Sequence, residues 1–412
     1  MEKKLKRALG KVVSGDLFWD REKEKELFIG RIREGANILL VAQRRMGKTS
    51  LLAEVANILQ DEFIVLFIDL QDAKSGPDAI AKMGMEIHKY NASLFEKIKG
   101  VFGNILDKVE GINAGDFGIT LRAGIPKSDW TNRGDKLLET LTKEEKRIVI
   151  MIDELPILIN KILRSKEGNI TPESKAEAEE FMSWVRKNSI KHQGRISFVL
   201  SGSIGLGPVL HQVGLSATIN NFVPFELPAW DKNTAVSCLK ALGLEYGIEY
   251  EEGILETICN LLGSPIPHHV QMFFGHIYDR CKMKETTRCT KKDVQTIYQQ
   301  DMLSARGQTE LMHYEERLKM VLGEDCAALA FDMLTEAAVE KVLTHEAIQA
   351  FQKQYTFESR SVEDVQQEII WVLEHDGYLR KNTKGYLFVS KLLRDWWKAR
   401  YSNVYIPVRK RK

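Results

Sequence analysis

A short loop near the N-terminus has the residue types and the position of a phosphate-binding loop. Residues 42–49 read Ala-Gln-Arg-Arg-Met-Gly-Lys-Thr. The apolar run at 37–41 before them is typical of a buried strand, and the segment after them is helix-prone. A phosphate-binding loop needs a strand before it and a helix after it, and both are expected here. A chance match of eight residues is therefore less favoured than a true phosphate-binding loop. Ala42 replaces the first glycine of the usual pattern, and its small side chain fits the same turn.

Three residues of this loop would contribute to binding in different ways. Gly47 lets the backbone approach an anion closely, and the N-terminus of the next helix favours negative charge. Lys48 can reach the outer phosphates of a nucleotide, and we therefore count it among the catalytic residues. The Thr49 hydroxyl can ligate Mg²⁺. We therefore predict that the loop binds ATP or GTP. The residues expected to line the phosphates are Ala42, Gln43, Arg44, Arg45, Met46, Gly47, Lys48, Thr49 and Ser50.

A second motif, about a hundred residues later, supplies two carboxylates. Residues 147–152 form a continuous apolar run of the kind found in a buried parallel strand, and Asp153 and Glu154 follow it. We expect Asp153 to ligate Mg²⁺ through water. Glu154 would act on the water that attacks the terminal phosphate, either as general base or by positioning it. The alternative, an acidic pair that caps the next helix, is less favoured because the phosphate-binding loop accompanies the pair.

A third polar group follows another strand-like run. Residues 195–200 read as another buried-type strand, and Ser201-Gly202-Ser203 follow it. A hydroxyl at the tip of a strand beside the carboxylates can hydrogen-bond the attacking water or the phosphate. Ser201 and Ser203 are the candidates, and we assign Ser203 to the catalytic set. An ordinary turn between the strand and the following loop explains the Ser-Gly-Ser sequence about as well as a catalytic role does.

The composition is that of an ordinary globular protein of two or three domains. The 412 residues are 44% hydrophobic and 28% charged, with only 10 prolines. With 59 basic and 57 acidic residues, the net charge of +2 favours no nucleic-acid partner over the whole chain. The five cysteines form no C-x-x-C pair, the N-terminus lacks an apolar signal core, and no run could span a bilayer. We expect a reduced, cytoplasmic protein with no structural zinc and no membrane partner.

The remaining pattern of the first half favours an α/β fold. A strand is predicted at 63–69 and helices at 23–34 and 78–88, which is the alternation of a parallel sheet. The Gly-rich stretch at 102–135 is predicted to be an insertion, with strand-like alternation at 117–122 that suggests a hairpin.

The order of these motifs resembles that of the prokaryotic STAND-type ATPases. Within them the chain is similar to the archaeal ATPase branch grouped with the MalT and NACHT proteins, relatives of the Orc/Cdc6-type AAA+ proteins. The matching residues, within a resemblance that spans about 14–402, are Phe18-x-x-Arg21-Glu22, the Arg-rich P-loop, Ile152-Asp153-Glu154, Ser201-Gly202-Ser203 and Phe225-Glu226-Leu227-Pro228. The resemblance implies ATP and Mg²⁺ as ligands and slow ATP hydrolysis. ATP is favoured over GTP on this ground, since no Asn-Lys-x-Asp motif occurs.

The resemblance also implies further nucleotide contacts. A segment before the P-loop covers the adenine in such ATPases, which points to Phe18, Trp19 and Arg21; aromatic packing at a helix N-terminus is an equal alternative. Gly263-x-Pro265 resembles the lid motif whose proline approaches the base or ribose. The next helix carries His268, His269 and His276, and it lacks the arginine of many AAA+ second sensors. We expect these histidines to pack in the lid and to bind no metal.

The chain is predicted to comprise a P-loop core at 1–228, a helical lid at 229–318, a winged-helix domain at 319–402 and a basic tail at 403–412. Three helices, at 325–335, 344–353 and 362–375, precede a two-stranded ribbon at 377–381 and 385–389, which is the pattern of a winged helix. A closing helix at 390–398 resembles the C-terminal signature of the archaeal branch.

The winged helix has two possible roles. Arg380, Lys381, Lys384 and the tail at 409–412 could contact DNA phosphates. The helix that would read bases, at 362–375, has four acidic residues and no Arg or Lys. Packing on the nucleotide domain, as in STAND relatives, is therefore favoured, and the tail is then a disordered, solvated end.

Three functions fit these observations. The leading one is a nucleotide-controlled switch in signalling, stress or defence, which would act through a homo-oligomer or a partner effector. The runner-up is a DNA-associated AAA+ loader or initiator, and the third is a nucleotide-bound scaffold with little turnover. Arg44, Arg45 and Arg195 could each serve as an arginine finger or as plain surface charge.

Overall fold

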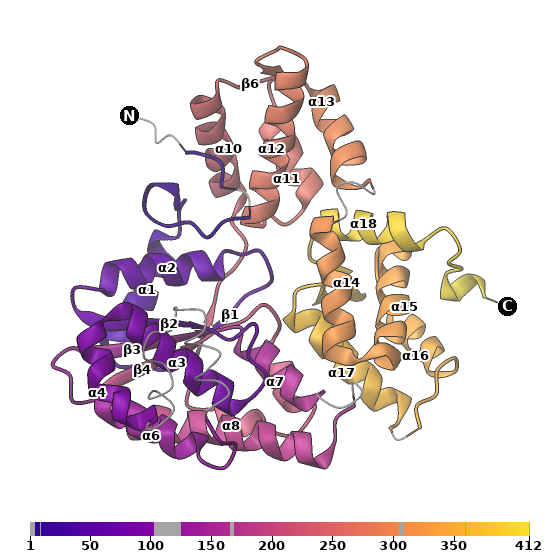
Figure 1. The fold of residues 1–412 in the computed structure, drawn as a ribbon. Helices are drawn as coiled ribbons and strands as arrows, with labels where there is room; N and C mark the ends of the chain where they lie inside the picture. Colours follow the sequence, from indigo (N-terminus) through magenta and orange to yellow (C-terminus); the bar gives the residue numbers. More distant parts are fainter. Residues whose placement is uncertain are drawn as a thin grey trace. The chain divides into compact units, whose positions relative to one another are not determined.

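The computed structural model describes residues 5–8, 10–102, 125–164, 169–304, 309–358 and 360–411. The chain forms two compact units, both traced in Figure 1. The sheet unit comprises Arg21–Val41 and Leu51–Leu227. The helical unit comprises Met1–Asp20, Ala42–Ser50 and Pro228–Lys412. Among the described helices, none is both long enough and apolar enough to cross a membrane.

The sheet unit contains a five-stranded parallel sheet in the order β2-β3-β4-β1-β5. The predicted α/β fold with a parallel P-loop sheet is therefore confirmed. The strands are β1 (Ile38–Val41), β2 (Phe63–Asp69), β3 (Arg147–Asp153), β4 (Ile196–Leu200) and β5 (Val223–Glu226). Nearly every residue of β3 and β4 is buried, because helices cover both faces of a parallel sheet. We did not predict β5, which is an edge strand with mostly exposed residues and therefore no buried apolar run.

Hydrogen bonds of Asn37 fix the start of β1 relative to the segments next to it. Its amide Nδ2 donates to the carbonyl of Ser189 at 3.0 Å, and its Oδ1 accepts from the backbone N–H of Phe198 at 2.9 Å. Its own carbonyl accepts from the N–H of Val223 at 2.8 Å. The side chain is buried, so these bonds replace water for every polar group involved. The carboxyl ends of β1, β3 and β4 consequently meet at one edge of the sheet, where ligands of open α/β folds bind.

Helices surround this sheet. They are α1 (Glu22–Arg33), α2 (Lys48–Leu59), α3 (Gly76–Tyr90), α4 (Ala92–Phe102), α6 (Trp130–Leu141), α7 (Leu155–Leu163), α8 (Pro172–Lys191) and α9 (Leu206–His211), with a 3₁₀ turn at Ser216–Ile219. The predicted hairpin at 117–122 and most of the predicted insertion at 102–135 lie outside the described residues. The helix α6 begins inside the predicted insertion, where Trp130 stacks on Phe181 of α8.

The first part of the helical unit joins the N-terminal segment to the helices after the sheet. These elements are a 3₁₀ turn at Gly15–Leu17, α10 (Lys232–Tyr246), β6 (Glu249–Tyr250), α11 (Ile254–Leu262), α12 (Pro267–Met283), β7 (Arg288–Cys289), α13 (Lys291–Thr296) and a π-helix at Ile297–Met302. The backbone N–H of Arg7 donates to the hydroxyl of Tyr246, and that of Ala8 donates to Oε1 of Gln271. The N-terminal segment is thus fastened to α10 and α12.

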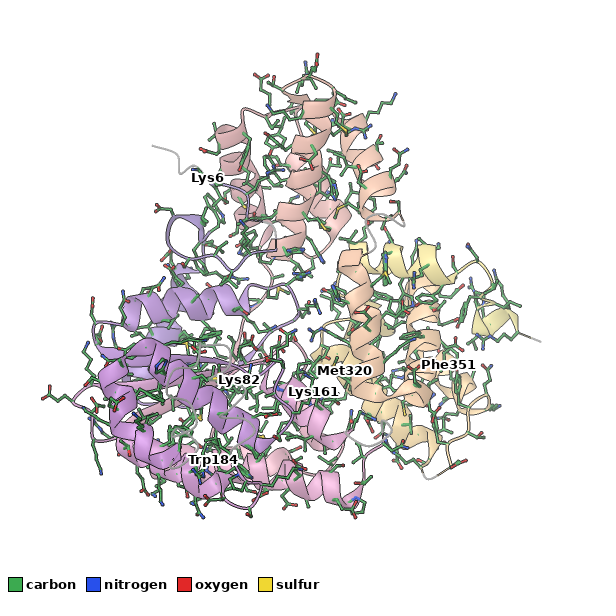
Figure 2. All side chains as sticks on the ribbon, in the orientation of Figure 1. Lys6, Lys82, Lys161, Trp184, Met320 and Phe351 are labelled. Atoms are coloured by element: carbon green, nitrogen blue, oxygen red, sulfur yellow. The ribbon has the colours of Figure 1, made fainter. Side chains whose placement is uncertain are left out.

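The C-terminal part contains the helices and the ribbon that the sequence predicts. The elements are α14 (Thr309–Leu322), α15 (Glu324–Glu340), α16 (His345–Gln352), α17 (Val362–His375), β8 (Leu379–Asn382), β9 (Gly385–Phe388), α18 (Lys391–Tyr401) and a 3₁₀ turn at Val408–Lys410. The strands β8 and β9 pair antiparallel around a turn at Thr383 and Lys384. Phe351, labelled in Figure 2, lies in the core of this part. The domain boundaries and the winged-helix assignment stay predictions.

The C-terminal tail differs from the prediction. Glu336 of α15, a buried carboxylate, accepts hydrogen bonds from the hydroxyl of Tyr405 at 2.9 Å and the N–H of Val408 at 3.1 Å. Arg409 forms an ion pair with Glu340 at 2.8 Å. The prediction of a disordered, solvated tail is therefore wrong, because an acidic helix face in the same unit binds it.

Candidate functional site

The P-loop follows β1 and leads into α2. Arg45 and Gly47 have left-handed backbone conformations, with φ of 68° and 88°. An L-residue in that conformation costs on the order of 1 kcal/mol, so Arg45 carries local strain. The buried Nζ of Lys48 donates to the carbonyls of Ala42 at 2.8 Å and Gln43 at 3.0 Å. Both of these acceptors are neutral carbonyl oxygens.

The P-loop also contacts the C-terminal part of the helical unit. Gly377 lies between α17 and β8 with φ of 76°, and a Cβ atom there would lie 1.9 Å from Cδ of Gln43. The backbone of Gly377 and the Gln43 side chain are therefore in direct contact. We did not predict this contact: a glycine after a helix signals a left-handed turn, but it does not reveal which distant residue packs on it.

Two buried tyrosines lie beside the same loop. The hydroxyl of Tyr378 donates to the carbonyl of Tyr314 at 2.6 Å, and their rings meet edge to face. Burial raises the pKa of Tyr314 to about 12, an effect that the positive charges of Arg44 and Arg45 oppose. The two arginines of the P-loop thus sit in the electrostatic environment of Tyr314. Their role as arginine fingers stays a prediction.

The positive charge of the P-loop also affects His269 at the start of α12. His269 is 1% exposed, and its Nδ1 has no hydrogen-bond partner among the described residues. Burial lowers the pKa of His269 to about 3, and the positive charge of Arg45 acts in the same direction. The imidazole is consequently neutral at physiological pH, as expected for a histidine that packs in a core.

The predicted lid motif precedes this helix. The carbonyl of Pro265 accepts from the N–H of Trp230 at 3.2 Å. A Cβ atom on Gly263, whose φ is 75°, would lie 2.6 Å from the backbone nitrogen of Lys391, so the first turn of α18 contacts the motif. The contact of Pro265 with a nucleotide stays a prediction.

The predicted carboxylates and serines meet at the edge of the sheet. The hydroxyl of Ser201 donates to Oδ1 of buried Asp153 at 2.6 Å. The same Oδ1 accepts from the N–H of Glu154 at 3.0 Å. Oε2 of Glu154 accepts from the N–H of Ser203 at 2.9 Å and from its hydroxyl at 2.6 Å. Each serine thus binds one oxygen of one carboxylate.

Gly202 lets the two serines approach the carboxylates. A Cβ atom on Gly202 would lie 2.4 Å from Cδ of Pro156 and 3.6 Å from Oε2 of Glu154. The carbonyl of Ser201 accepts from the N–H of Leu155 at 3.2 Å, next to this contact. The segment after β4 is therefore packed directly on the start of α7.

A further connection lies at the same edge, after β2. Asp69 is the register partner of Asp153, and its carbonyl accepts from Nζ of Lys82 at 2.6 Å. Nζ of Lys161 donates to the carbonyl of Gln71 at 2.5 Å; Lys82 and Lys161 are labelled in Figure 2. Two lysines from α3 and α7 thus hold the connection beside the carboxylates. We did not predict their role, because single lysines on helices carry no distinctive sequence signal.

Two other predicted arginines lie in the sheet unit. Arg21 is buried with φ of 77°, and its Nη1 donates to Oε1 of Glu24 at 2.9 Å. Nη2 of Arg195 donates to the carbonyl of Thr142 at 3.1 Å and to that of Glu144. Arg195 therefore stabilises the connection between α6 and β3. The contact of Arg21 with adenine, like those of Phe18 and Trp19, stays a prediction.

The donor atoms fit a phosphate and a hard metal ion. The P-loop offers an ammonium group and the N-terminus of a twelve-residue helix, which suit an anion. Thr49 and Asp153 offer oxygen atoms, the ligand type that Mg²⁺ prefers. Glu154, the carboxylate next to Asp153, is of the residue type that can accept a proton from water.

The comparisons with known proteins show the fold. No protein-family model matches the sequence, and no curated protein matches it either. The chain is similar to the Walker-type ATPase PABY2304 of Pyrococcus abyssi, with 16% identity, a TM-score of 0.58, and coverage of 93% of this chain and 97% of that one. It is also similar to the ORC2 protein of Aeropyrum pernix, solved as ADPNP–ADP complexes, with 12% identity, a TM-score of 0.51, and coverage of 92% and 93%. The chain therefore has the fold of P-loop ATPases.

We expect Gly202→Ala to destabilise the protein. The added methyl group overlaps the Pro156 ring, which is part of the backbone and cannot rotate away, so the free energy of unfolding should fall by about 1–3 kcal/mol. Urea unfolding measures this change. Gly30→Ala in α1 is the control, because its Cβ would meet nothing within 4 Å and helix propensity favours alanine by about 1 kcal/mol. Wild-type stability of Gly202→Ala would show that the packing described for the two serines is wrong.

Proposed function

We propose that this chain is an ATP-binding, Mg²⁺-dependent ATPase that works as a nucleotide-controlled switch. The P-loop and the Asp153–Glu154 pair, each directly after a strand of one parallel sheet, support nucleotide binding and hydrolysis. One protein of similar fold is described as a Walker-type ATPase, and the other was solved with ADPNP and ADP. These descriptions favour an adenine nucleotide.

The residues would divide the chemistry between them. Thr49 and Asp153 would supply oxygen ligands to Mg²⁺, which neutralises phosphate charge when bound. Lys48 and the N–H groups of the loop would stabilise the terminal phosphate. Glu154 would take a proton from the attacking water while the oxygen of that water forms a bond to the γ-phosphorus. The bond from that phosphorus to the bridging oxygen breaks, its electron pair leaves with ADP, and inorganic phosphate is released.

The observation that carries the switch is the contact between Gln43 and Gly377. The loop that would hold the phosphates packs on the connection between α17 and β8. Close-packed contacts do not deform continuously, so a change in the loop on nucleotide binding or hydrolysis would be transmitted to the C-terminal helices. A homo-oligomer or a partner effector would then respond to their new arrangement.

A second candidate function is DNA binding by the C-terminal part. Arg380, Lys381 and Lys384 are exposed on the β8–β9 ribbon, where a winged helix would contact phosphates. The C-terminal tail is less available for contact with DNA phosphates, since Arg409 is paired with Glu340. The exposed cations of the ribbon are the observation that favours this candidate.

Lys48→Ala and Glu154→Gln test the ATPase. Lys48→Ala should abolish ATP binding in isothermal titration, because the charge that faces the phosphates is lost. Glu154→Gln should bind ATP normally and release phosphate at least about 100-fold more slowly, since the amide accepts no proton. Exposed Lys240→Ala is the control for loss of charge. Wild-type affinity of Lys48→Ala would refute the P-loop assignment, and tight ATP binding by a wild type without turnover would favour a nucleotide-bound scaffold.

Gly377→Ala tests the switch. The new methyl group should displace the flexible Gln43 side chain and change the ratio of ADP to ATP-analogue affinities by at least about fivefold. Gly247→Ala is a matched control: its φ is 66°, so it carries similar backbone strain, but its Cβ would meet nothing within 4 Å. Both variants should lose about 1 kcal/mol of stability. Equal affinity ratios in the two variants would contradict coupling through this contact.

Salt-dependent binding to labelled duplex DNA tests the second candidate. Combined replacement of Arg380, Lys381 and Lys384 by alanine should weaken binding and reduce the slope of log affinity against log salt by about one per lost contact. Lys240→Ala should leave the slope unchanged. Removal of residues 404–412 should have a smaller effect, because part of that charge is already paired within the protein. No measurable affinity of the intact chain would remove this candidate.

A further inference from the structure

Ser203 makes an unusual pair of contacts with the carboxylate of Glu154. Its backbone N–H and its hydroxyl both donate to the same atom, Oε2, at 2.9 and 2.6 Å. Among the described residues, both hydrogen bonds to this carboxylate go to Oε2. A carboxylate held at one oxygen by two donors from one residue cannot rotate without breaking both bonds.

The backbone on both sides of this contact is also held in place. Glu154 precedes α7 in a left-handed conformation, with φ of 57°, and its carbonyl accepts from the N–H groups of Ile157 and Leu158. Gly202 packs on Pro156, and the carbonyl of Ser201 accepts from Leu155. Ser203 and Glu154 therefore belong to two segments that contact each other next to these hydrogen bonds.

The neighbouring carboxylate also accepts a hydrogen bond from a serine hydroxyl. Ser201 donates to Oδ1 of Asp153, and Ser203 donates to Oε2 of Glu154. One oxygen of each carboxylate is thus occupied by a serine. In this arrangement Oε1 of Glu154 is the carboxylate oxygen that can contact a reacting water.

We propose that Ser203 is a positioning residue that orients Glu154, so that Oε1 accepts the proton of the hydrolytic water. This inference rests on the proposed ATPase function and assigns Ser203 a role different from that of a phosphate sensor. A sensor would contact the nucleotide itself, whereas Ser203 acts through the carboxylate that it binds.

Kinetics of the full-length chain test this proposal. Ser203→Ala keeps the backbone N–H bond and loses the hydroxyl bond, so kcat for ATP hydrolysis should fall about tenfold while KM and ATP affinity stay unchanged. Ser203→Thr keeps both donors and should restore kcat to within about threefold of wild type. Urea unfolding of both variants shows whether a drop in kcat reflects loss of folded protein.

A double variant gives the decisive comparison. In a Glu154→Gln background, Ser203→Ala should have no further effect on turnover, because the group that it orients is already lost. An equal drop in both backgrounds, a change in ATP affinity, or wild-type kcat in Ser203→Ala would overturn the proposal. If the wild type neither binds nor hydrolyses ATP, the proposed function fails instead, and the two failures are distinguishable.

Discussion

The parallel pairing of β3 with β4 is the constraint on which the candidate site depends. Ile152 lies opposite Leu200 in this register, so Asp153 and Ser201 leave the sheet side by side. The 2.6 Å hydrogen bond between them follows from that adjacency. A slip of one residue would turn every side chain of the strand to the opposite face and separate the carboxylates from the serines. The apolar burial on both faces of β3 and β4 therefore preserves the geometry of the polar groups at their ends.

The P-loop depends on a different set of contacts. It is grouped with the helical unit, where Gln43 packs on Gly377 and the charges of Arg44 and Arg45 act on buried Tyr314 and His269. A loop that has to bind an anion usually requires space and backbone freedom. Here the same loop also packs on the C-terminal part through Gln43 and Gly377, and the proposed switch rests on that contact.

Backbone strain is concentrated at the predicted site residues. In the described part of the chain, the residues other than glycine with positive φ are Asp20, Arg21, Arg45, Glu154, Glu285 and Lys341. Three of them, Arg21, Arg45 and Glu154, are residues that the sequence motifs assign to nucleotide binding or catalysis. Strained conformations persist where the surrounding structure holds them, and they gather at sites that need a fixed geometry. Fixed hydrogen bonds around Glu154 agree with this account.

The sequence by itself determined the strands at 63–69 and 147–152, the identity of the polar residues after the strands, and the C-terminal helices expected at 325–335, 344–353, 362–375 and 390–398. Apolar runs of strand length and apolar residues at helical spacing are local signals, and they sufficed for those elements. The short strand β5 was missed because an exposed edge has no apolar pattern, and the tail was misjudged because its partners, Glu336 and Glu340, are distant in sequence. Only the tertiary structure decided which serine binds which carboxylate and which glycine the P-loop meets. Such contacts depend on strand order and on packing between distant segments, for which neither composition nor local spacing carries a signal.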